Sequence, residues 1–250
     1  MSRARAIADI IRTVGGKEVP HKFTSAIIVA AGSSSRMGAE TAKQFLELCG
    51  MPVVVHALRA YEQSELINEI IVVCREQDIP AYEEYKQKFA IKKLARIVTG
   101  GQSRQESVIK GLEAISDKAK YVAIADGARP LTTPEMIRRV LRAAYQYDAA
   151  TAAVRAQDTV KCVKNGFITA TVPRQEVWLA QTPQAFSVNL YRAAAYHAVE
   201  TGAVATDDNS LVEAIGRSVF TVDCGKSNIK ITTPEDLIIA RALLEAQREV

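Results

Sequence analysis

Residues 26–43 read AIIVAAGSSSRMGAETAK, and this stretch decides what the chain can be. Its first six residues, Ala26–Ala31, are apolar and too few for a typical helix, so they predict a buried β-strand. A loop of glycine and serine follows at once, and glycine lets backbone N–H groups approach an anion closely. Because Arg36 and Lys43 add two cations to this loop, the combination predicts a site for a nucleoside triphosphate.

The loop differs from two related phosphate-binding motifs. A Walker A loop places its lysine directly after the second glycine, whereas Lys43 lies five residues beyond Gly38. The dinucleotide fingerprint GxGxxG is absent as well. A Gly/Ser turn alone would be interpreted as a solvated strand-to-helix connection, and the two cations favour phosphate binding over that interpretation.

The composition narrows the function class. The chain has 250 residues, 48% hydrophobic and 24% charged, which is typical of a globular protein with a sizeable core. Its net charge of +4, with both signs interspersed, suits a phosphorylated small molecule. Aromatic residues make up 6%, which argues against a base-stacking platform, so no nucleic-acid partner is expected. No apolar run reaches transmembrane length, and no membrane partner is expected.

Cysteine usage and the N-terminus bear on the compartment. The four cysteines are widely scattered with no C-x-x-C pair, which predicts neither a zinc site nor a disulfide framework and favours a reducing compartment. Residues 1–22 are interpreted as an N-terminal extension, because Asp9 and polar breaks interrupt any signal-peptide core. The sequence therefore favours the bacterial cytoplasm, with a plastid transit peptide as the alternative.

From residue 23 onward strand-like runs alternate with helical ones, and we expect residues 23–250 to form one domain. Apolar strands in this alternation predict an α/β fold, a Rossmann-like, mostly parallel sheet flanked by helices. Ligands bind beyond the carboxyl ends of such strands, where Gly32, Gly100-Gly101 and Asp126 would meet. The expected strands are Ala26–Ala31, Glu69–Cys74, Arg96–Thr99, Tyr121–Ala125 and Ala149–Val154, and the expected helices are Pro52–Gln63, Pro80–Phe89, Ser103–Ile115 and Pro134–Tyr147.

The pattern changes after Val154. Thr159–Val163 and Phe167–Val172 flank Asn165-Gly166, a strong signal for a two-residue hairpin turn. An isolated hairpin is marginally stable in water, so this protruding arm, about residues 155–176, is expected to pack on a second subunit. The chain is then expected to return through Trp178–Gln181, helices near Ser187–Glu200 and Asp207–Ile215, a strand at Ser218–Asp223 and a final helix from Pro234.

Two more motifs follow predicted strands. Residues 100–107, GGQSRQES, open a helix whose free N–H groups favour an anion or a polar base edge. Residues 126–130, DGARP, place Asp126 at a strand end, where a carboxylate accepts ribose or polyol hydroxyls or reaches a metal ion. The structural alternatives are a glycine turn capped by Ser103 and a pairing of Asp126 with Arg129 across the turn.

Together the motifs resemble the 2-C-methyl-D-erythritol 4-phosphate cytidylyltransferase family from about Thr24 to Leu244. The stretches in register are AAGSSSRMG…KQFLEL, GGQSRQESV, DGARP, AQDTVK, Arg174…Trp178…TPQAF, TDDNSLVE and NIKITTPEDL. The resemblance implies an enzyme, a nucleotidyltransferase that joins CTP to methylerythritol phosphate and releases pyrophosphate. It also implies Mg²⁺ or another divalent cation, held mainly by phosphates and water. The alternatives are a cytidylyltransferase for ribitol 5-phosphate or another polyol phosphate, or a non-catalytic nucleotide-binding module.

The resemblance further implies roles for individual residues. The residues that would stabilise the transition state and clamp the phosphates are Arg36, Lys43, Arg174 and Lys230. The residues that would contact the nucleotide are Ala30, Ala31, Gly32, Ser33, Gly101, Gln102, Ser107, Asp126 and Gly127. The residues that would contact the acceptor are Asp126, Arg129, Thr159, Arg174, Thr182 and Lys230.

Two further consequences concern assembly and the first loop. Family members pair as homodimers by exchanging such an arm, so Thr159 is expected to complete the neighbouring subunit's site. The family usually has proline before the catalytic lysine, where this chain has Ala42. Since proline would stiffen the loop, Lys43 is expected to be less well preorganised here.

Overall fold

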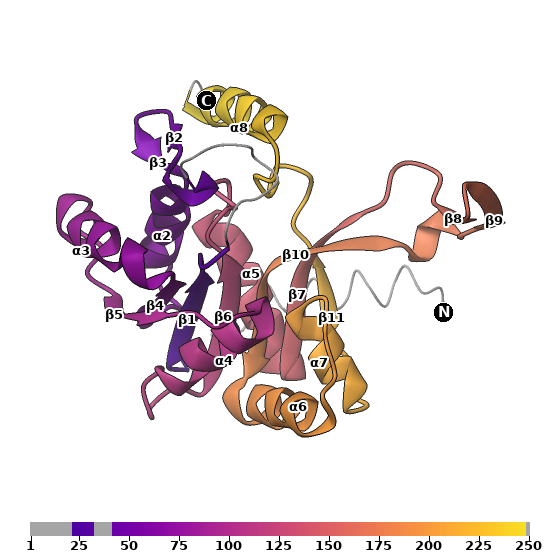
Figure 1. The fold of residues 1–250 in the computed structure, drawn as a ribbon, viewed down its shortest axis with the longest axis horizontal. Coiled ribbons are helices and arrows are strands. Elements are labelled where there is room, and N and C mark those ends of the chain that lie inside the picture. Colours follow the sequence, from indigo (N-terminus) through magenta and orange to yellow (C-terminus); the bar gives the residue numbers. More distant parts are fainter. Residues whose placement is uncertain (1–21, 33–41, 249–250) are drawn as a thin grey trace.

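The computed structural model describes residues 22–32 and 42–248, and a seven-stranded sheet lies at its centre (Figure 1). Its strands are β1 (Thr24–Val29), β4 (Glu69–Cys74), β5 (Leu94–Thr99), β6 (Tyr121–Asp126), β7 (Ala149–Arg155), β10 (Trp178–Ser187) and β11 (Phe220–Asp223). The strand order is β11-β7-β10-β6-β1-β4-β5. All neighbouring pairs are parallel except those of β10, which runs antiparallel to β6 and β7. The predicted mostly parallel sheet is confirmed.

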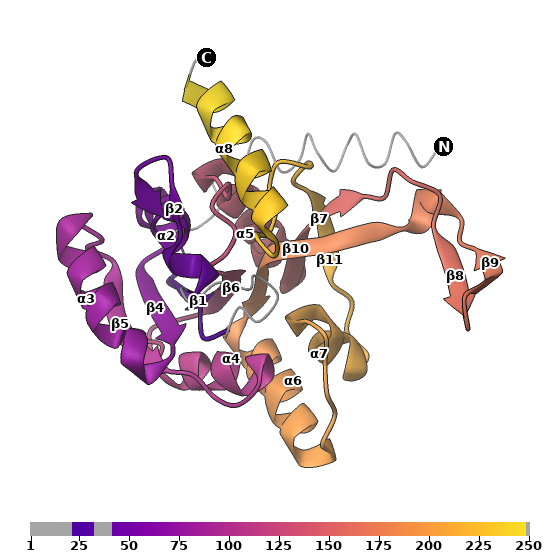
Figure 2. The ribbon, with the colours of Figure 1, turned by 45° about the horizontal axis from the view of Figure 1, so that its top comes forward.

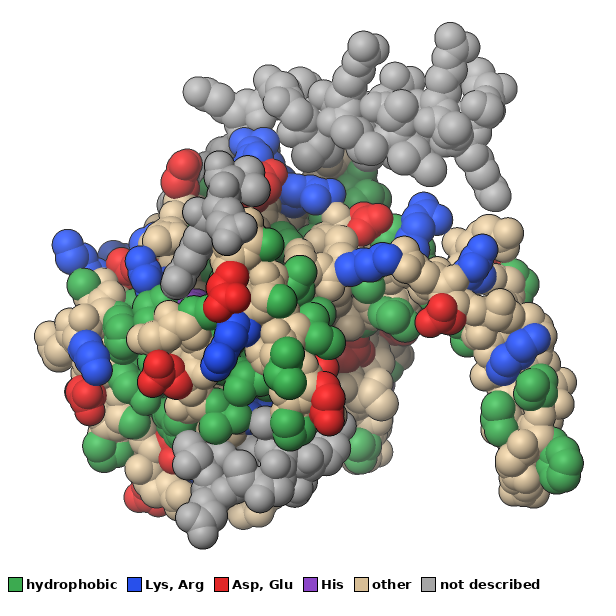
Figure 3. Space-filling view, turned by 90° about the horizontal axis from the view of Figure 1, so that it is seen from above, with side chains coloured by type: hydrophobic (Ala, Val, Ile, Leu, Met, Phe, Trp, Pro, Cys, Tyr) green, Lys and Arg blue, Asp and Glu red, His purple; other side chains and the backbone are tan. Residues whose placement is uncertain are grey.

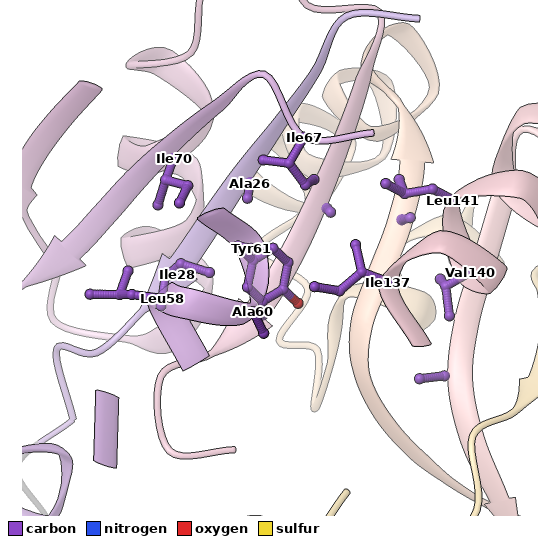
Figure 4. Close-up of a cluster of buried hydrophobic side chains, with 14 of the residues drawn as sticks. Ala26, Ile28, Leu58, Ala60, Tyr61, Ile67, Ile70, Ile137, Val140 and Leu141 are labelled. Carbon is purple, nitrogen blue, oxygen red and sulfur yellow. The ribbon is translucent and has the colours of Figure 1, made fainter. Parts of the chain in front are cut away.

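Helices cover both faces of the sheet, as expected. They are α2 (Val53–Gln63), α3 (Ile79–Lys88), α4 (Arg104–Glu113), α5 (Pro134–Tyr147), α6 (Val188–Thr201) and α7 (Asp208–Ala214). The last helix, α8 (Pro234–Arg248), packs in a separate apolar cluster with Leu48 and Val53. Side chains that alternate along β1 belong to two cores, since Ile28 packs with α2 and α5 whereas Ile27 packs with α4 and α6. Figure 4 shows part of the first core, with Tyr61 of α2 and Ile137 of α5 among its members.

The direction in which the sheet grows reverses at β1. The chain passes from β1 to β4 and β5 on one side and then returns to β6 on the other. The register of β1 and β6 places Asp126 opposite Val29, so the two strands end together. In open α/β sheets a ligand crevice forms at such a reversal, beyond the carboxyl ends of the strands. The ends of β1 and β6 are therefore where a ligand is expected.

Strand β10 is longer than the sequence predicts. The sequence predicts a strand over Trp178–Gln181, but the strand continues to Ser187 through the middle of the sheet. Its register shifts between Ala180 and Gln184, and Pro183 lies within the shift. Proline lacks an N–H donor and normally argues against a central strand, so the bulge reconciles this sequence with the sheet. Strand β1 also begins and ends two residues before its predicted bounds.

The predicted hairpin is confirmed as β8 (Lys161–Lys164) and β9 (Phe167–Thr171). Its turn residues, Asn165 and Gly166, have φ values of 53° and 83°, which the Asn-Gly pair tolerates well. Figures 1 and 2 show the arm projecting away from the sheet, and both strands are exposed along their length. Three large apolar side chains of the arm are exposed to solvent: Val163 is 59% exposed, Phe167 77% and Ile168 64%. Its role in dimerisation stays a prediction, and residues 1–21 of the predicted extension lie outside the described residues.

Candidate active site

The loops after β1, β5 and β6 meet at the carboxyl edge of the sheet, as predicted. Each begins with a backbone hydrogen bond to the neighbouring strand: Ala30 donates to Val73 (2.8 Å), Gly100 to Cys74 (2.8 Å) and Gly127 to Val29 (2.9 Å). A Cβ on Gly100 would lie 2.7 Å from the Cβ of Ala31, so a larger residue would push the β1 and β5 loops apart. The expected convergence of these loops therefore depends on glycine at position 100.

Side chains of α4 hold the loop that precedes it. The Ser103 hydroxyl accepts a hydrogen bond from the Glu106 N–H (3.0 Å) and caps the helix. The Ser107 hydroxyl accepts from the Gly101 N–H (3.0 Å), and the Glu106 carboxylate accepts from the Gln102 N–H (2.8 Å). The capped glycine turn considered as a structural alternative is thus present. It orders Gly101, Gln102 and Ser107 as one unit beside the edge of the sheet.

Asp126 lies at the centre of a cluster of opposite charges. Within the described residues its carboxylate lies 3.0 Å from Lys230 Nζ, 3.4 Å from Arg129 Nε and 3.7 Å from Arg104 Nε. The pairing with Arg129 across the turn is therefore real, but it is one contact of several. Arg104 is also paired with Asp208, so these three cations face two carboxylates, and the cluster keeps one positive charge in excess.

The electrostatics of this cluster keep Asp126 ionised. Burial disfavours the charged form of the carboxyl, but Lys230, Arg129 and Arg104 together hold its pKa below the usual range. Burial likewise lowers the pKa of Arg129, and a guanidinium still remains protonated at neutral pH. The site is therefore a preformed set of fixed charges rather than a proton-transfer pair.

Arg104 belongs to this cluster, although no sequence motif predicts a role for it. Its Nη2 donates to Asp208 Oδ2 over 2.7 Å, and the other oxygen of Asp208 accepts from the Tyr191 hydroxyl (2.6 Å). Asp208 is 1% exposed, so this contact is well shielded. The sequence predicts only that Asp207-Asp208 opens a helix, which is confirmed by the Asp207 cap of α7. Arg104 and Asp208 are 104 residues apart, and no local spacing indicates their contact.

Thr182 and Asn228 are hydrogen-bonded to members of the cluster. The Thr182 hydroxyl accepts a hydrogen bond from the Asp126 N–H (3.0 Å), which fixes the end of β6. Arg129 donates from Nη1 to the backbone carbonyl of Asn228 (2.6 Å). Among the predicted acceptor-binding residues, the structure thus brings together Asp126, Arg129, Thr182 and Lys230.

Lys43 begins the short helix η2 (Lys43–Phe45), and its neighbour anchors that helix to the sheet. Gln44 is 3% exposed and donates to the carbonyl of Ala30 (3.0 Å), so the residue after Lys43 is tied to the end of β1. Ala42, just before Lys43, has φ −62° and ψ 135°. A proline ring imposes nearly this φ, so the backbone already has the conformation that the family's proline would favour.

The remaining predicted residues are not part of the Asp126 cluster. Thr159 and Arg174 are exposed residues of the arm, and Arg174 donates to the backbone carbonyl of Gln157 (2.6 Å). Figure 3, viewed from above, shows the arm extending well beyond the body of the protein. Ser33 and Arg36 lie outside the described residues, and their roles stay predictions.

The fold and the site together define a class of protein. Glycine-containing loops and a cationic cluster lie at the reversal point of a mostly parallel sheet, as in α/β proteins that bind nucleotides and other phosphorylated ligands. Within that class the chain belongs to the 2-C-methyl-D-erythritol 4-phosphate cytidylyltransferase family, whose model matches residues 24–246. The family resemblance predicted from the motifs is therefore confirmed, and with it the class of enzyme.

Relatives and solved structures agree with this assignment. The chain is 44% identical over 230 residues to the 2-C-methyl-D-erythritol 4-phosphate cytidylyltransferase of Pelotomaculum thermopropionicum, covering 90% of this chain and 95% of the relative. Its fold matches the crystal structure of 4-diphosphocytidyl-2C-methyl-D-erythritol synthase from Anaerococcus prevotii with a TM-score of 0.81 and 32% identity, over 91% and 98% of the two chains. The crystal structure of the Thermus thermophilus cytidylyltransferase gives a TM-score of 0.73 at 32% identity, over 88% and 98%.

Two wider observations concern the part of the chain that the structure describes. No helix in it combines the length and apolar character needed to cross a membrane. Cys49, Cys74, Cys162 and Cys224 all lie in the described ranges and are free thiols.

Asp126→Asn tests the charge cluster through the pH dependence of the unfolding free energy. At pH 7 the variant is expected to lose about 3 kcal/mol of unfolding free energy, because partly buried cations are left unpaired. The folded-state pKa of Asp126 is lowered, so its stabilisation is present above about pH 4 and disappears as the pH falls through the folded-state value.

Urea unfolding of parent and variant at several pH values measures this effect. The difference between the two proteins should shrink below about pH 4. Asp117→Asn, at an exposed position, is the control and should change stability by less than about 0.5 kcal/mol at every pH. A difference for Asp126→Asn that stays constant on acidification contradicts the assigned electrostatics.

Ala42→Pro tests whether the loop before Lys43 is already preorganised. Because the native φ suits proline, the substitution is expected to raise the unfolding free energy by about 0.4–1 kcal/mol through a less flexible unfolded chain. Thermal and urea unfolding measure the gain, and turnover should be unchanged or higher. Ala90→Pro is the control expected to destabilise, because Ala90 has φ 51°. A loss of stability in Ala42→Pro would contradict the expected fit of proline at this position.

Proposed function

We propose that this protein transfers the cytidylyl group of CTP to 2-C-methyl-D-erythritol 4-phosphate, giving 4-diphosphocytidyl-2-C-methyl-D-erythritol and pyrophosphate in non-mevalonate isoprenoid biosynthesis. The observation that carries the proposal is the surplus-positive cluster around Asp126, in a chain of this family. Reaction between two phosphate-bearing substrates requires such a cluster, because the anions otherwise repel each other.

The chemistry is an in-line displacement at phosphorus. A phosphate oxygen of the acceptor forms a bond to the α-phosphorus of CTP, and the bond from that phosphorus to the bridging oxygen breaks. The electron pair leaves with pyrophosphate. Because the attacking oxygen is already anionic, no general base is needed, and positioning and electrostatic stabilisation supply the catalysis. Lys43 and Arg36 are assigned to the charge on the transferred group, and Lys230 and Arg129 to the acceptor phosphate.

Mg²⁺ is proposed as the cofactor, bound by the triphosphate and water. Within the described residues no group of three or more His, Cys, Asp or Glu side chains is placed to hold a metal ion. Asp126 is engaged by cations rather than open to a metal. Mg²⁺ keeps several waters and binds substrate phosphates, so the proposed ion would need few protein ligands and would neutralise charge on the leaving pyrophosphate.

The acceptor site is proposed to be completed by a second copy of the chain. Thr159 and Arg174 are exposed residues of the arm, which also exposes Val163, Phe167 and Ile168. Exposed apolar groups of this kind mark interaction surfaces. In a homodimer with exchanged arms, each arm would bring its threonine and arginine to the partner's acceptor phosphate. No nucleic acid is proposed as a partner, and the free cysteines together with bacterial relatives support the cytoplasm as the compartment.

Release of pyrophosphate from CTP and Mg²⁺ tests the function, with methylerythritol phosphate and ribitol 5-phosphate offered in parallel. Turnover is expected with methylerythritol phosphate only. Lys43→Ala should lower kcat by about 10²–10³-fold with nearly unchanged CTP affinity, because its charge acts mainly in the transition state. Lys92→Ala, at an exposed position, is the matched control and should behave like the parent.

Each other outcome of this assay has a definite meaning. Turnover with ribitol 5-phosphate alone assigns the enzyme to another pathway with the same chemistry. No turnover with either acceptor favours a non-catalytic nucleotide-binding module. Equal kcat in Lys43→Ala and the parent removes Lys43 from the catalytic set.

Complementation between two inactive variants tests the exchanged arm. Arg174→Ala and Lys230→Ala are each expected to lose most activity. If one site uses Lys230 of one chain and Arg174 of the other, a mixed dimer has one intact site. Random pairing then restores about a quarter of the parent's activity, because half of the dimers are mixed and half of their sites are intact. Co-expression with two different affinity tags isolates the mixed dimers, and no recovery in them contradicts the exchange.

A further inference from the structure

A buried asparagine in the loop between β11 and α8 is hydrogen-bonded to Arg129 of the cationic cluster. Asn228 is fully buried, with 0% of its surface exposed, and lies two residues before Lys230. An amide side chain in such a place must be hydrogen-bonded, because a buried polar group without partners is costly. Its partners therefore indicate what it holds together.

The hydrogen bonds of Asn228 link its own loop to two other segments of the chain. Its Nδ2 donates to the Thr182 carbonyl (2.8 Å) and to Gln181 Oε1 (3.2 Å), both in β10. Its Oδ1 accepts from the Thr132 hydroxyl (3.0 Å), and its backbone carbonyl accepts from Arg129 Nη1. Donors and acceptors of this one residue thus join β10, the turn after β6 and the loop that carries Lys230.

We propose that Asn228 is a positioning residue that holds Arg129 and Lys230 in register to receive the acceptor's phosphate. The proposal rests on the proposed function for the identity of the acceptor. Arg129 is held directly through the Asn228 carbonyl, and Lys230 is held through the loop. The same side chain also fixes Thr182, whose hydroxyl accepts the Asp126 N–H. Asn228 therefore supports Asp126 and two of its cationic partners at once.

The chemistry of the contacts explains why this position needs an amide. Two acceptors, the Thr182 carbonyl and Gln181 Oε1, face Nδ2, so a carboxylate of the same shape would meet them without a donor. The loop has an independent anchor, because the Ile231 N–H donates to the Ala128 carbonyl (2.8 Å) and the Ile231 side chain is buried. Loss of the amide is therefore expected to loosen the cluster without unfolding the loop.

The experiment compares Asn228→Asp, which keeps the shape, with Asn228→Ala, which removes the side chain. Calorimetric titration with CTP counts the folded, competent sites of each protein, and all rates are expressed per such site. With methylerythritol phosphate, kcat/KM for the acceptor should fall about 10²-fold, because a small misplacement of a charged group has this effect. The affinity for CTP should change by less than about threefold, since the hydrogen bonds of the amide within residues 22–32 and 42–248 go to Gln181, Thr182 and Thr132 and not to the loops after β1 and β5.

Inorganic phosphate gives a second readout that does not depend on turnover. The parent should bind it at the cationic cluster, and both variants should bind it at least about tenfold more weakly. Asn68→Ala is the matched control: Asn68 accepts from the Thr24 N–H (2.9 Å) at the opposite, amino edge of the sheet. This variant should lose stability but keep the parent's phosphate affinity and its kinetic constants per site.

The two readouts separate the proposal from the proposed function. If the parent shows no turnover with methylerythritol phosphate but the variants still lose phosphate affinity, the function is wrong and the positioning role holds. Equal phosphate affinity in parent and both variants overturns the positioning role, whatever the turnover. A fall in CTP affinity as large as the fall for the acceptor also overturns it, because the residue would then serve the site as a whole.

Discussion

The buried carboxylate of Asp126 is the interaction on which the candidate site depends. Arg104, Arg129 and Lys230 come from α4, from the turn after β6 and from the loop before α8. Two like charges at 4 Å repel by about 4 kcal/mol near a protein surface, so these side chains need a shared counter-ion to lie together. Asp126 supplies it and still leaves excess positive charge at the open edge. Under the proposed function, a phosphate would bind here with little rearrangement of the charges, which is what electrostatic catalysis requires.

The sheet topology explains why the arm emerges beside this cluster. Strand β10 runs antiparallel to both β6 and β7, so β7 and β6 point the same way. The carboxyl end of β7, where the arm begins, therefore lies at the same edge as Asp126. The arm ends where β10 enters the sheet, at that edge again, and Thr182 follows shortly afterwards. One antiparallel strand thus places both the arm and a support for Asp126 at the reversal point.

Local patterns predicted most of the fold but only part of the site. Apolar runs such as Glu69–Cys74 form strands because burial on both faces demands it, and Asn165-Gly166 sets its turn by backbone preference alone. The central part of β10 was not predicted, because Pro183 argues against a strand and the bulge that accommodates it depends on pairing with neighbouring strands. The contact between Arg104 and Asp208 joins residues distant in sequence, and no periodicity encodes such a pair. No local pattern predicts a role for Lys230, which was predicted only from the family resemblance.

The division of the site between sheet and arm has an energetic consequence. Side chains around Asp126 are fixed by packing and hydrogen bonds before any ligand arrives, so binding orders them little further. Arg174 is exposed on the arm, whose apolar hairpin tip has no cover from the described part of its own chain. Under the proposed function, the acceptor phosphate would be held by rigid cations of one chain and by the arm of the other. Ligand binding and dimer formation would then stabilise each other, because a ligand that contacts both chains binds the assembled state preferentially.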